Sequence, residues 1–325
     1  MLAGVFELRG RRNRAAIERR LVHAFGPGAA ELAGFAGPLA VISERPAGFA
    51  DTGGANEVGI ALDGSIYNSL ELAGELDADP RAGDTELLAR AYERWGERML
   101  EKLRGGFALV AWREDGGRVL LAQDQVAIGA LFVHRDANEL AFASEVHHLL
   151  ALLPRTPEPD SVAVVRSLAL ESLHDGRTMF KGVRRLGAGR ALVIADGRAS
   201  ERRYYSPSYV EPMRGSRLES AAMLRDAVIG AVGLRMRGIG AVGVTLSGGF
   251  DSSAIAAAAA RGRDADQRLY GYSAVFPDDP RMDDRDHLDV LAEKLPIANV
   301  RLRVAPGGAL RVALDYLREW RLPLI

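Results

Sequence analysis

The chain has 325 residues, of which 48% are apolar and 26% are charged, and its formal net charge is −1. This composition predicts a globular protein of about two domains, at roughly 100–200 residues per domain. The near-zero net charge argues against a general attraction to nucleic acid or to anionic membranes. Because there is no cysteine, disulfides, thiolate metal sites and a thiol nucleophile are excluded. The sequence shows no secretory signal and no apolar run of about 18 residues, so we expect a cytoplasmic protein.

The N-terminal region begins with a basic run, in which six arginines fall between positions 9 and 20. No aromatic side chains interleave the run. It therefore favours a solvated helix face over a nucleic-acid site.

Residues 1–205 read as many short strands with two helices. Apolar side chains recur at helical spacing over residues 85–104, which predicts one amphipathic helix. Strand-like runs, separated by turns that contain glycine, aspartate and asparagine, are expected at 58–62, 107–112, 119–123, 130–134, 140–144 and 191–194. This pattern predicts an α+β domain of antiparallel sheets flanked by helices.

Residues 206–325 have a different sequence pattern from residues 1–205. They open with a linker that contains Ser206, Pro207, Pro212 and Gly215, after which strands and helices alternate. The expected order is helix 218–236, strand 241–246, helix 252–262, strand 269–276, helix 284–295, strand 299–304 and helix 309–319. Strands separated by helices need crossover connections, which predicts an α/β domain with a parallel sheet and helices on its faces.

The most informative segment, residues 246–253, reads Leu-Ser-Gly-Gly-Phe-Asp-Ser-Ser and follows the first of these strands. Gly248 and Gly249 allow a sharp turn and a close approach of the backbone to a ligand. Ser252 and Ser253 fall at a helix N-terminus, whose unpaired N–H groups suit an anion. A phosphate-binding loop at the carboxyl end of a strand is therefore predicted, and the alternative is a glycine-rich turn with a serine cap.

An acidic residue, Asp251, lies inside this predicted anion site. A carboxylate there is unfavourable unless a cation accompanies the phosphates, so the sequence predicts Mg²⁺. The segment has no Walker A lysine and instead resembles the pyrophosphate loop of the ATP pyrophosphatases, which cleave ATP between its α- and β-phosphates. The resemblance implies that Asp251 is catalytic and holds the metal. It implies that ATP and pyrophosphate are bound by Leu246, Ser247, Gly248, Gly249, Asp251, Ser252 and Ser253.

The N-terminal half resembles class II glutamine amidotransferase domains. The family motifs N-G-E-I-Y-N, S-D-T-E, F-A-S-E and I-F-K-G-I-R-R-L are similar to residues 63–68, 83–86, 142–145 and 178–186. Together with the pyrophosphate loop, these motifs resemble the asparagine synthetase family over nearly the whole chain. The resemblance implies a degenerate Ntn-type αββα sandwich over 1–205. Over 206–325 it implies the N-terminal half of an ATP-pyrophosphatase-type domain.

The glutaminase motifs depart from the family pattern. The family uses an N-terminal cysteine followed by glycine, whereas Ala3 precedes Gly4 here, and alanine cannot serve as a nucleophile. Asp63 replaces the asparagine whose amide, with Gly64, donates to the oxyanion, and a carboxylate would repel the developing charge. The resemblance therefore implies a scaffold without glutaminase chemistry, in which Ala3, Asp63, Gly64 and Asp84 mark the degenerate site.

Members of this family that lack the glutaminase adenylate a carboxylate and take nitrogen from an amine of the substrate. They include the lasso peptide cyclases and the β-lactam synthetases, and the run 317–323 is more similar to the cyclases. The resemblance implies an ATP- and Mg²⁺-dependent, AMP-forming ligase that closes the macrolactam of a ribosomally made lasso peptide. Its substrate would be a precursor or core peptide, and its partners a leader-processing protease and a leader-binding protein. The alternatives are a β-lactam synthetase-like enzyme, a glutamine-independent asparagine synthetase, a tRNA-modifying enzyme and an inactive nucleotide-binding scaffold.

Two further features have two interpretations each. Ala274 lies near the end of strand 269–276, where the family contacts adenine, but the residues alone equally fit a core strand. Six aspartates between positions 278 and 289 suggest Mg²⁺ ligands, although a solvated loop entering a helix N-terminus is favoured. The histidines have no metal-ligand spacing.

The family continues beyond the equivalent of residue 325. A glycine-rich, acidic motif there completes the pyrophosphate and magnesium site, and a helical part carries further catalytic residues. We therefore expect this chain to be a fragment that is inactive alone and whose parallel sheet has an unfinished edge.

Overall fold

The computed structural model describes residues 1–8, 14–26, 33–43, 48–50, 58–113, 117–171, 173, 175–212, 215–276, 284–304 and 308–321. Contacts divide the chain into two units, Met1–Ser208 with Ala313–Ile325, and Tyr209–Val312. Each unit has a buried core of its own. Across the described ranges, no helix combines the length and the apolar character that crossing a membrane requires.

The first unit contains two antiparallel sheets. In the first sheet the strand order is β10-β8-β9-β1-β3-β2, and in the second it is β12-β11-β7-β6-β5-β4. The strands of the first sheet are β1 (Leu2–Glu7), β2 (Ala33–Ala36), β3 (Leu39–Ser43), β8 (Phe132–Arg135), β9 (Glu139–Ala143) and β10 (Val183–Arg185). Those of the second are β4 (Gly48–Ala50), β5 (Val58–Ile66), β6 (Gly105–Arg113), β7 (Arg118–Gln123), β11 (Arg190–Ala195) and β12 (Arg198–Arg203).

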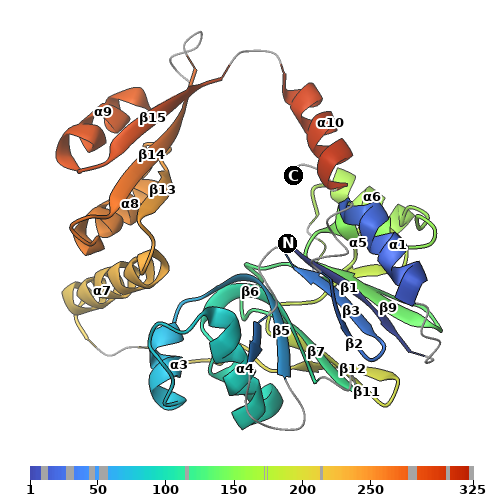
Figure 1. Ribbon diagram of the computed structural model, residues 1–325. Coiled ribbons are helices and arrows are strands. Elements are labelled where there is room, and N and C mark those ends of the chain that lie inside the picture. Colours follow the sequence, from blue (N-terminus) through green and yellow to red (C-terminus); the bar gives the residue numbers. More distant parts are fainter. Residues whose placement is uncertain are drawn as a thin grey trace. The chain divides into compact units, whose positions relative to one another are not determined.

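Helices cover the outer face of each sheet, which gives four layers (Figure 1). The helices of this unit are α1 (Arg14–Phe25), α3 (Ser69–Glu75), α4 (Asp84–Trp95), α5 (Val146–Leu152) and α6 (Ser161–Leu168). Side chains of α1 and α5 share a buried cluster with the first sheet, and those of α3 and α4 share another with the second. A third cluster, which includes Leu2 and Trp112, lies between the sheets. The expected αββα sandwich is confirmed. The expectation of only two helices was wrong, because α3, α5 and α6 are too short to show a helical period.

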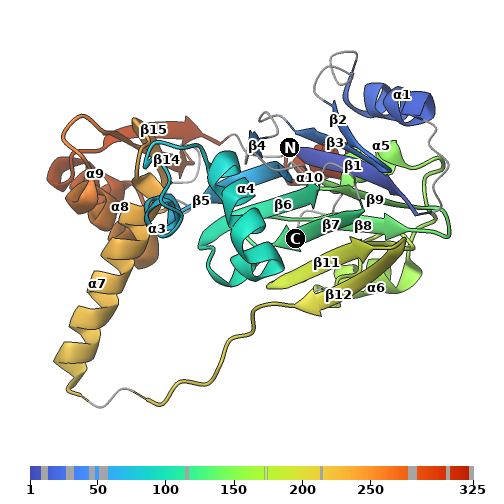
Figure 2. The same cartoon turned by 60° about the horizontal axis from the view of Figure 1, so that its bottom comes forward.

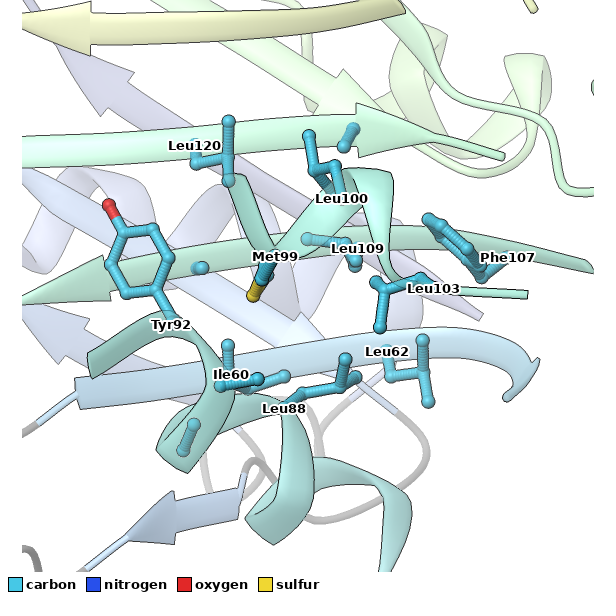
Figure 3. Close-up of a cluster of buried hydrophobic side chains, with 14 of the residues drawn as sticks. Ile60, Leu62, Leu88, Tyr92, Met99, Leu100, Leu103, Phe107, Leu109 and Leu120 are labelled. Carbon is cyan, nitrogen blue, oxygen red and sulfur yellow. The ribbon is translucent and has the colours of Figure 1, made fainter. Parts of the chain in front are cut away.

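The amphipathic segment expected as one helix over 85–104 is broken. Helix α4 ends at Trp95, Gly96 adopts a positive φ of 58°, and a 3₁₀ turn, η1 (Gly96–Glu101), follows. Glycine tolerates this backbone conformation without steric cost. The break redirects Met99 and Leu100 into the cluster that also contains Tyr92 and Leu103, whose side chains are drawn in Figure 3.

A buried carboxylate organises the crossing between the two sheets. Asp124 follows β7 and has no exposed surface. Its Oδ2 accepts hydrogen bonds from the N–H groups of Phe107 (3.1 Å) and Gly129 (2.7 Å). Its Oδ1 accepts from those of Val126 (3.0 Å) and Ile128 (3.1 Å). One side chain thus satisfies four backbone donors that would otherwise be costly to bury.

The second unit is built around a parallel sheet in the order β13-β14-β15. An exposed stretch without helix or strand, residues 206–212, precedes it (Figure 2). The elements of this part of the chain are α7 (Arg217–Met236), β13 (Ala241–Thr245), α8 (Phe250–Gly262), β14 (Arg268–Val275), α9 (Arg285–Lys294), β15 (Ala298–Arg303) and α10 (Ala309–Trp320). From Ala313 onwards α10 belongs to the first unit, where the ring of Trp320 lies 5.5 Å from that of His147.

Only one face of this sheet is covered by the described residues of its unit, whereas helices were expected on both faces. Because the strands follow one another in the same direction, two right-handed crossovers place α8 and α9 on the same side. Ala256 and Leu288, one from each helix, accordingly share a buried cluster. On the opposite face, Tyr272 and Leu302 are 40% and 54% exposed.

We expect Asp124→Asn to lower the free energy of unfolding by roughly 2–4 kcal/mol. In either orientation the asparagine NH₂ group would face two of the backbone N–H groups that Asp124 now satisfies. Urea unfolding followed by circular dichroism measures the change. Asp136→Asn is the control, because Asp136 accepts two backbone N–H bonds on an exposed turn. Equal effects of the two substitutions would contradict the role assigned to Asp124.

Candidate functional site

The predicted phosphate loop connects β13 to α8. Leu246 is buried, and its N–H donates to the carbonyl of Tyr272 at 2.8 Å, which ties the start of the loop to β14. Gly248 adopts a φ of 82°, and Gly249 is the N-cap of α8. The helix thus begins two residues earlier than expected, so Asp251 lies in its first turn.

The three serine hydroxyls of the loop converge on Gly249. Those of Ser252 and Ser253 donate to its carbonyl at 3.2 and 2.7 Å. The hydroxyl of Ser247 accepts the N–H of Gly249 at 3.3 Å and lies 3.1 Å from that of Ser252. These bonds hold the turn in a defined shape, so that the loop residues predicted from the sequence lie together around one helix N-terminus.

The electrostatics of this helix N-terminus suit phosphate. Helix geometry leaves the N–H groups of residues 250–252 without an intrahelical acceptor, and the helix dipole adds partial positive charge. Asp251 is exposed here. No group of three or more histidine, aspartate or glutamate side chains able to hold a metal occurs among the described residues. Mg²⁺ commonly uses only one or two carboxylates together with phosphates and water, so Asp251 fits such a role.

A second acidic residue lies against the loop. A Cβ placed on Gly248 would approach Cβ of Asp284 to 2.4 Å and its carbonyl oxygen to 3.2 Å. Asp284 was expected in a solvated loop entering a helix, and it is indeed the N-cap of α9. Its packing against Gly248 was not foreseen, because it depends on the parallel pairing of β13 and β14. Of the other aspartates in this stretch, Asp286 and Asp289 lie on α9, while positions 278, 279 and 283 fall outside the described residues.

Ala274 lies near the carboxyl end of β14, on the open face of the sheet. It pairs with Leu302 and is exposed, whereas its neighbours Ser273 and Val275 are buried. Ala274 is therefore not a core residue in the described part of the unit. Its place at the same sheet end as the loop keeps it available for contact with a ligand.

The residues of the degenerate glutaminase motif lie in the first unit. Asp63 is in β5, and one of its carboxylate oxygens lies 3.4 Å from the α-amino nitrogen of Met1. Gly64 has a φ of 117°, and a Cβ there would lie 2.1 Å from the carbonyl oxygen of Gly106. Asp84 begins α4 and accepts the N–H of Ile66 at 3.1 Å. Asp84 thus joins the end of β5 to the start of α4.

The structure corrects the place expected for Ala3. Its side chain has no exposed surface and belongs to the cluster beneath α1 and α5, with Ile42 and Ala143 as its strand neighbours. Ala3 therefore packs in a core of the first unit. The group recorded beside the Asp63 carboxylate is the α-amino nitrogen of Met1, at 3.4 Å.

Glu145, the last residue of the F-A-S-E segment, was not singled out from the sequence. Burial raises the pKa of its carboxyl group, and the neighbouring Asp63 carboxylate raises it further. Two carboxylates therefore occupy the region that the family motif assigns to glutaminase chemistry, and the α-amino group of Met1 and Arg185 partly offset their charge. Such a pair of carboxylates disfavours the negative charge that develops during amide hydrolysis.

Comparison with known proteins identifies two domain families in the chain. The family described as glutamine amidotransferase domain matches residues 41–205, and the family described as asparagine synthase matches residues 223–321. The first match contains Asp63, Gly64 and Asp84, and the second contains the phosphate loop.

Several curated relatives are asparagine synthetases. A putative glutamine-hydrolysing asparagine synthetase of Mycobacterium bovis is 34% identical over 218 residues, which cover 62% of this chain and 33% of the relative. Asparagine synthetase 1 of Bacillus subtilis is 29% identical over 205 residues, covering 62% of this chain and 32% of the relative. The matched part thus spans about a third of the length of these relatives. A solved structure of glutamine phosphoribosylpyrophosphate amidotransferase from B. subtilis aligns with a TM-score of 0.43 at 14% identity, covering 96% of this chain and 70% of that one.

We expect Gly248→Ala to destabilise the second unit by about 1–2 kcal/mol from backbone strain alone, because alanine resists a positive φ. The contact with Asp284 adds to this cost and should displace α9 from the loop. Gly249→Ala is the matched control, since Gly249 has a φ of −72° and a Cβ there would meet only the Ser247 hydroxyl, at 3.3 Å. Thermal unfolding and calorimetric titration with Mg·ATP measure both variants. Equal stability and affinity in the two would contradict the loop geometry.

The raised pKa of Glu145 leads to a pH-dependent prediction. A carboxyl group with a higher pKa in the folded state lowers stability as the pH rises from its unfolded towards its folded pKa. Glu145→Gln should therefore raise Tm at pH 7, and the gain should vanish below about pH 4, where the unfolded chain is also protonated. Glu158→Gln is a control of opposite sign, because the bond from Lys181 lowers the pKa of Glu158. A Glu145→Gln effect that is independent of pH would contradict the prediction.

Proposed function

Because the chain belongs to the asparagine synthetase family, we propose that it takes part in ATP-dependent amide-bond formation through an adenylated carboxylate. The observation that carries this proposal is the loop at residues 246–253. The loop brings together Gly248 with its positive φ, the N–H groups at the start of α8 that have no intrahelical acceptor, and the exposed side chain of Asp251.

The loop accounts for the first step of such a reaction. A substrate carboxylate oxygen attacks the α-phosphorus of ATP, the bond from that phosphorus to the bridging oxygen breaks, and pyrophosphate leaves. The N–H groups at the start of α8 would hold the departing pyrophosphate. Mg²⁺ bound at Asp251 would supply positive charge to the phosphate oxygens. Gly248 keeps side-chain atoms away from this point.

The first unit bears on which molecule supplies the nitrogen atom of the new amide bond. The chain contains no cysteine, and two carboxylates, those of Asp63 and Glu145, lie where the family carries out glutamine hydrolysis. We propose that an amine of the substrate attacks the acyl-adenylate instead. AMP then leaves, and the amine loses a proton. A peptide α-amine has a pKa of about 8, so a useful fraction is neutral at pH 7.

The finer proposal is macrolactam closure of a lasso peptide in the cytoplasm. The similarity of residues 317–323 to the cyclases supports it. The substrate would be a core peptide delivered by a leader-processing protease and a leader-binding protein. Holding both reacting groups of one peptide together contributes up to roughly 7–11 kcal/mol in favourable intramolecular cases. A β-lactam synthetase-like enzyme, a glutamine-independent asparagine synthetase and a nucleotide-binding scaffold are the alternatives that the test separates.

The test supplies the protein in its full natural length with ATP, Mg²⁺ and a leader-free core peptide. We expect a product lighter by one water, with AMP and pyrophosphate formed in step, and no turnover by Asp251→Ala. Acetylation of the peptide N-terminus should prevent closure, and neither ammonia nor glutamine should restore it. Mass spectrometry and nucleotide chromatography follow the reaction.

Other outcomes assign the protein differently. ADP in place of AMP would reject adenylation. Conversion of aspartate to asparagine would identify an ordinary synthetase, and closure of a β-amino acid would identify a β-lactam synthetase-like enzyme. Nucleotide binding without turnover of any of these substrates would leave a scaffold.

A further inference from the structure

An arginine-lined cavity lies at the end of α4 in the first unit, remote in sequence from the phosphate loop. Its volume is about 330 Å³. It is lined by Tyr92, Gly96, Glu97, Arg98, Arg113, Arg118 and Arg202. The four arginines come from η1, β6, β7 and β12, so the fold collects them from positions up to about a hundred residues apart. Figure 3 shows the hydroxyl of Tyr92 at the edge of the apolar cluster, pointing away from it.

One glutamate organises two of these arginines. The Glu97 carboxylate forms ion pairs with Arg118 and Arg202. The carbonyl oxygen of Glu97 accepts a further bond from Arg202 at 3.0 Å. Nε of Arg202 is buried and lies 3.1 Å from the carboxylate, yet it has no hydrogen-bond partner among the described residues. Glu97 therefore positions the two guanidinium groups without using all their donors.

The other two arginines bring positive charge that the cavity does not balance. Within the described part of the chain, neither Arg98 nor Arg113 forms an ion pair or a side-chain hydrogen bond. Among the described lining residues, four arginines and one glutamate give a net charge of +3. The partial negative charge at the C-terminus of α4 offsets only about half of one positive charge. Guanidinium groups gathered in this way repel one another unless an anion lies between them.

The charge and the shape together select a class of ligand. A carboxylate carries a single negative charge, whereas a phosphate group carries about −1.5 to −2 at pH 7 and matches this lining better. In addition, one guanidinium group can donate two parallel N–H hydrogen bonds to the oxygens of one phosphate group. Arg98 lines a neighbouring cavity of about 380 Å³ beside Trp95 and Lys102, which has room for the organic part of a phosphate ester.

The geometry points to a binding site for a small phosphate-bearing molecule in this cavity, with Arg98 and Arg113 as its free cationic ligands and Glu97 as the residue that positions Arg118 and Arg202. The site does not depend on the function proposed above. It lies in the unit that the family uses for glutamine, and it uses none of the glutaminase motif residues.

The first experiment locates the site in the unaltered chain. Phenylglyoxal modifies accessible arginines, and peptide mapping by mass spectrometry gives the rate at each position. We expect inorganic pyrophosphate to slow modification of Arg98 and Arg113 but not of Arg90, which pairs with Glu86 on the exposed face of α4. Unchanged rates at Arg98 and Arg113 would overturn the proposal, as would equal protection of Arg90.

The second experiment measures affinity by calorimetry. Gly248→Val serves as the background, so that the phosphate loop does not contribute binding of its own. Arg98→Gln and Arg113→Gln should each weaken pyrophosphate binding by about tenfold or more, because each removes a charge-assisted hydrogen bond. Arg90→Gln, which makes the same charge change on the adjacent helix α4, should leave it nearly unchanged. Equal effects of the three substitutions would reduce the site to general electrostatic attraction and overturn the proposal.

Discussion

Between β7 and β8 the chain passes from one sheet of the sandwich to the other, through a crossing in which Asp124 is buried while Val126 and Ile128 are exposed. Its N–H groups have no strand to pair with, and the carboxylate of Asp124 accepts them instead. Asp124 also holds the start of β11 in place, because its backbone carbonyl oxygen accepts the N–H of Gly189 at 2.9 Å. The hydroxyl of Tyr204 donates to the adjacent carbonyl of Gln123 at 2.7 Å. Burial, followed by the charge of Asp124, raises the pKa of Tyr204, which keeps this donor protonated.

The sheet geometry fixed in this way also holds the residues of the glutaminase motif. Gly64 meets the backbone of Gly106 so closely that any side chain would collide, so this position of β5 requires glycine whether or not an oxyanion is bound. Asp63 makes no comparable demand on the backbone, and its carboxylate lies beside Met1. The backbone thus restricts which residue can stand at position 64, whereas it places no such restriction on the neighbouring position 63.

The accuracy of the sequence-based predictions follows the range of the interactions involved. The elements of the second unit were placed to within about two residues, because apolar strand-like runs, glycine turns and helices alternate in short blocks. The loop residues from Leu246 to Ser253 were recognisable for the same reason. The break at Gly96 was missed, since apolar residues continue at helical spacing through it. The burial of Ala3, the contact of Asp284 with Gly248 and the convergence of Arg98, Arg113, Arg118 and Arg202 depend on the pairing of distant strands, for which a single sequence carries no signal.

The one-sided covering of the parallel sheet bears on the order in which the chain acquires structure. Three buried clusters belong to the first unit and one to the second, among the described residues. During synthesis from the N-terminus, the sandwich can therefore close before β13 is made. The sheet that follows keeps one face open, with Tyr272, Val300 and Leu302 in contact with water. The unit that carries the phosphate-loop sequence is thus also the one that leaves apolar strand residues in contact with water, among the residues described.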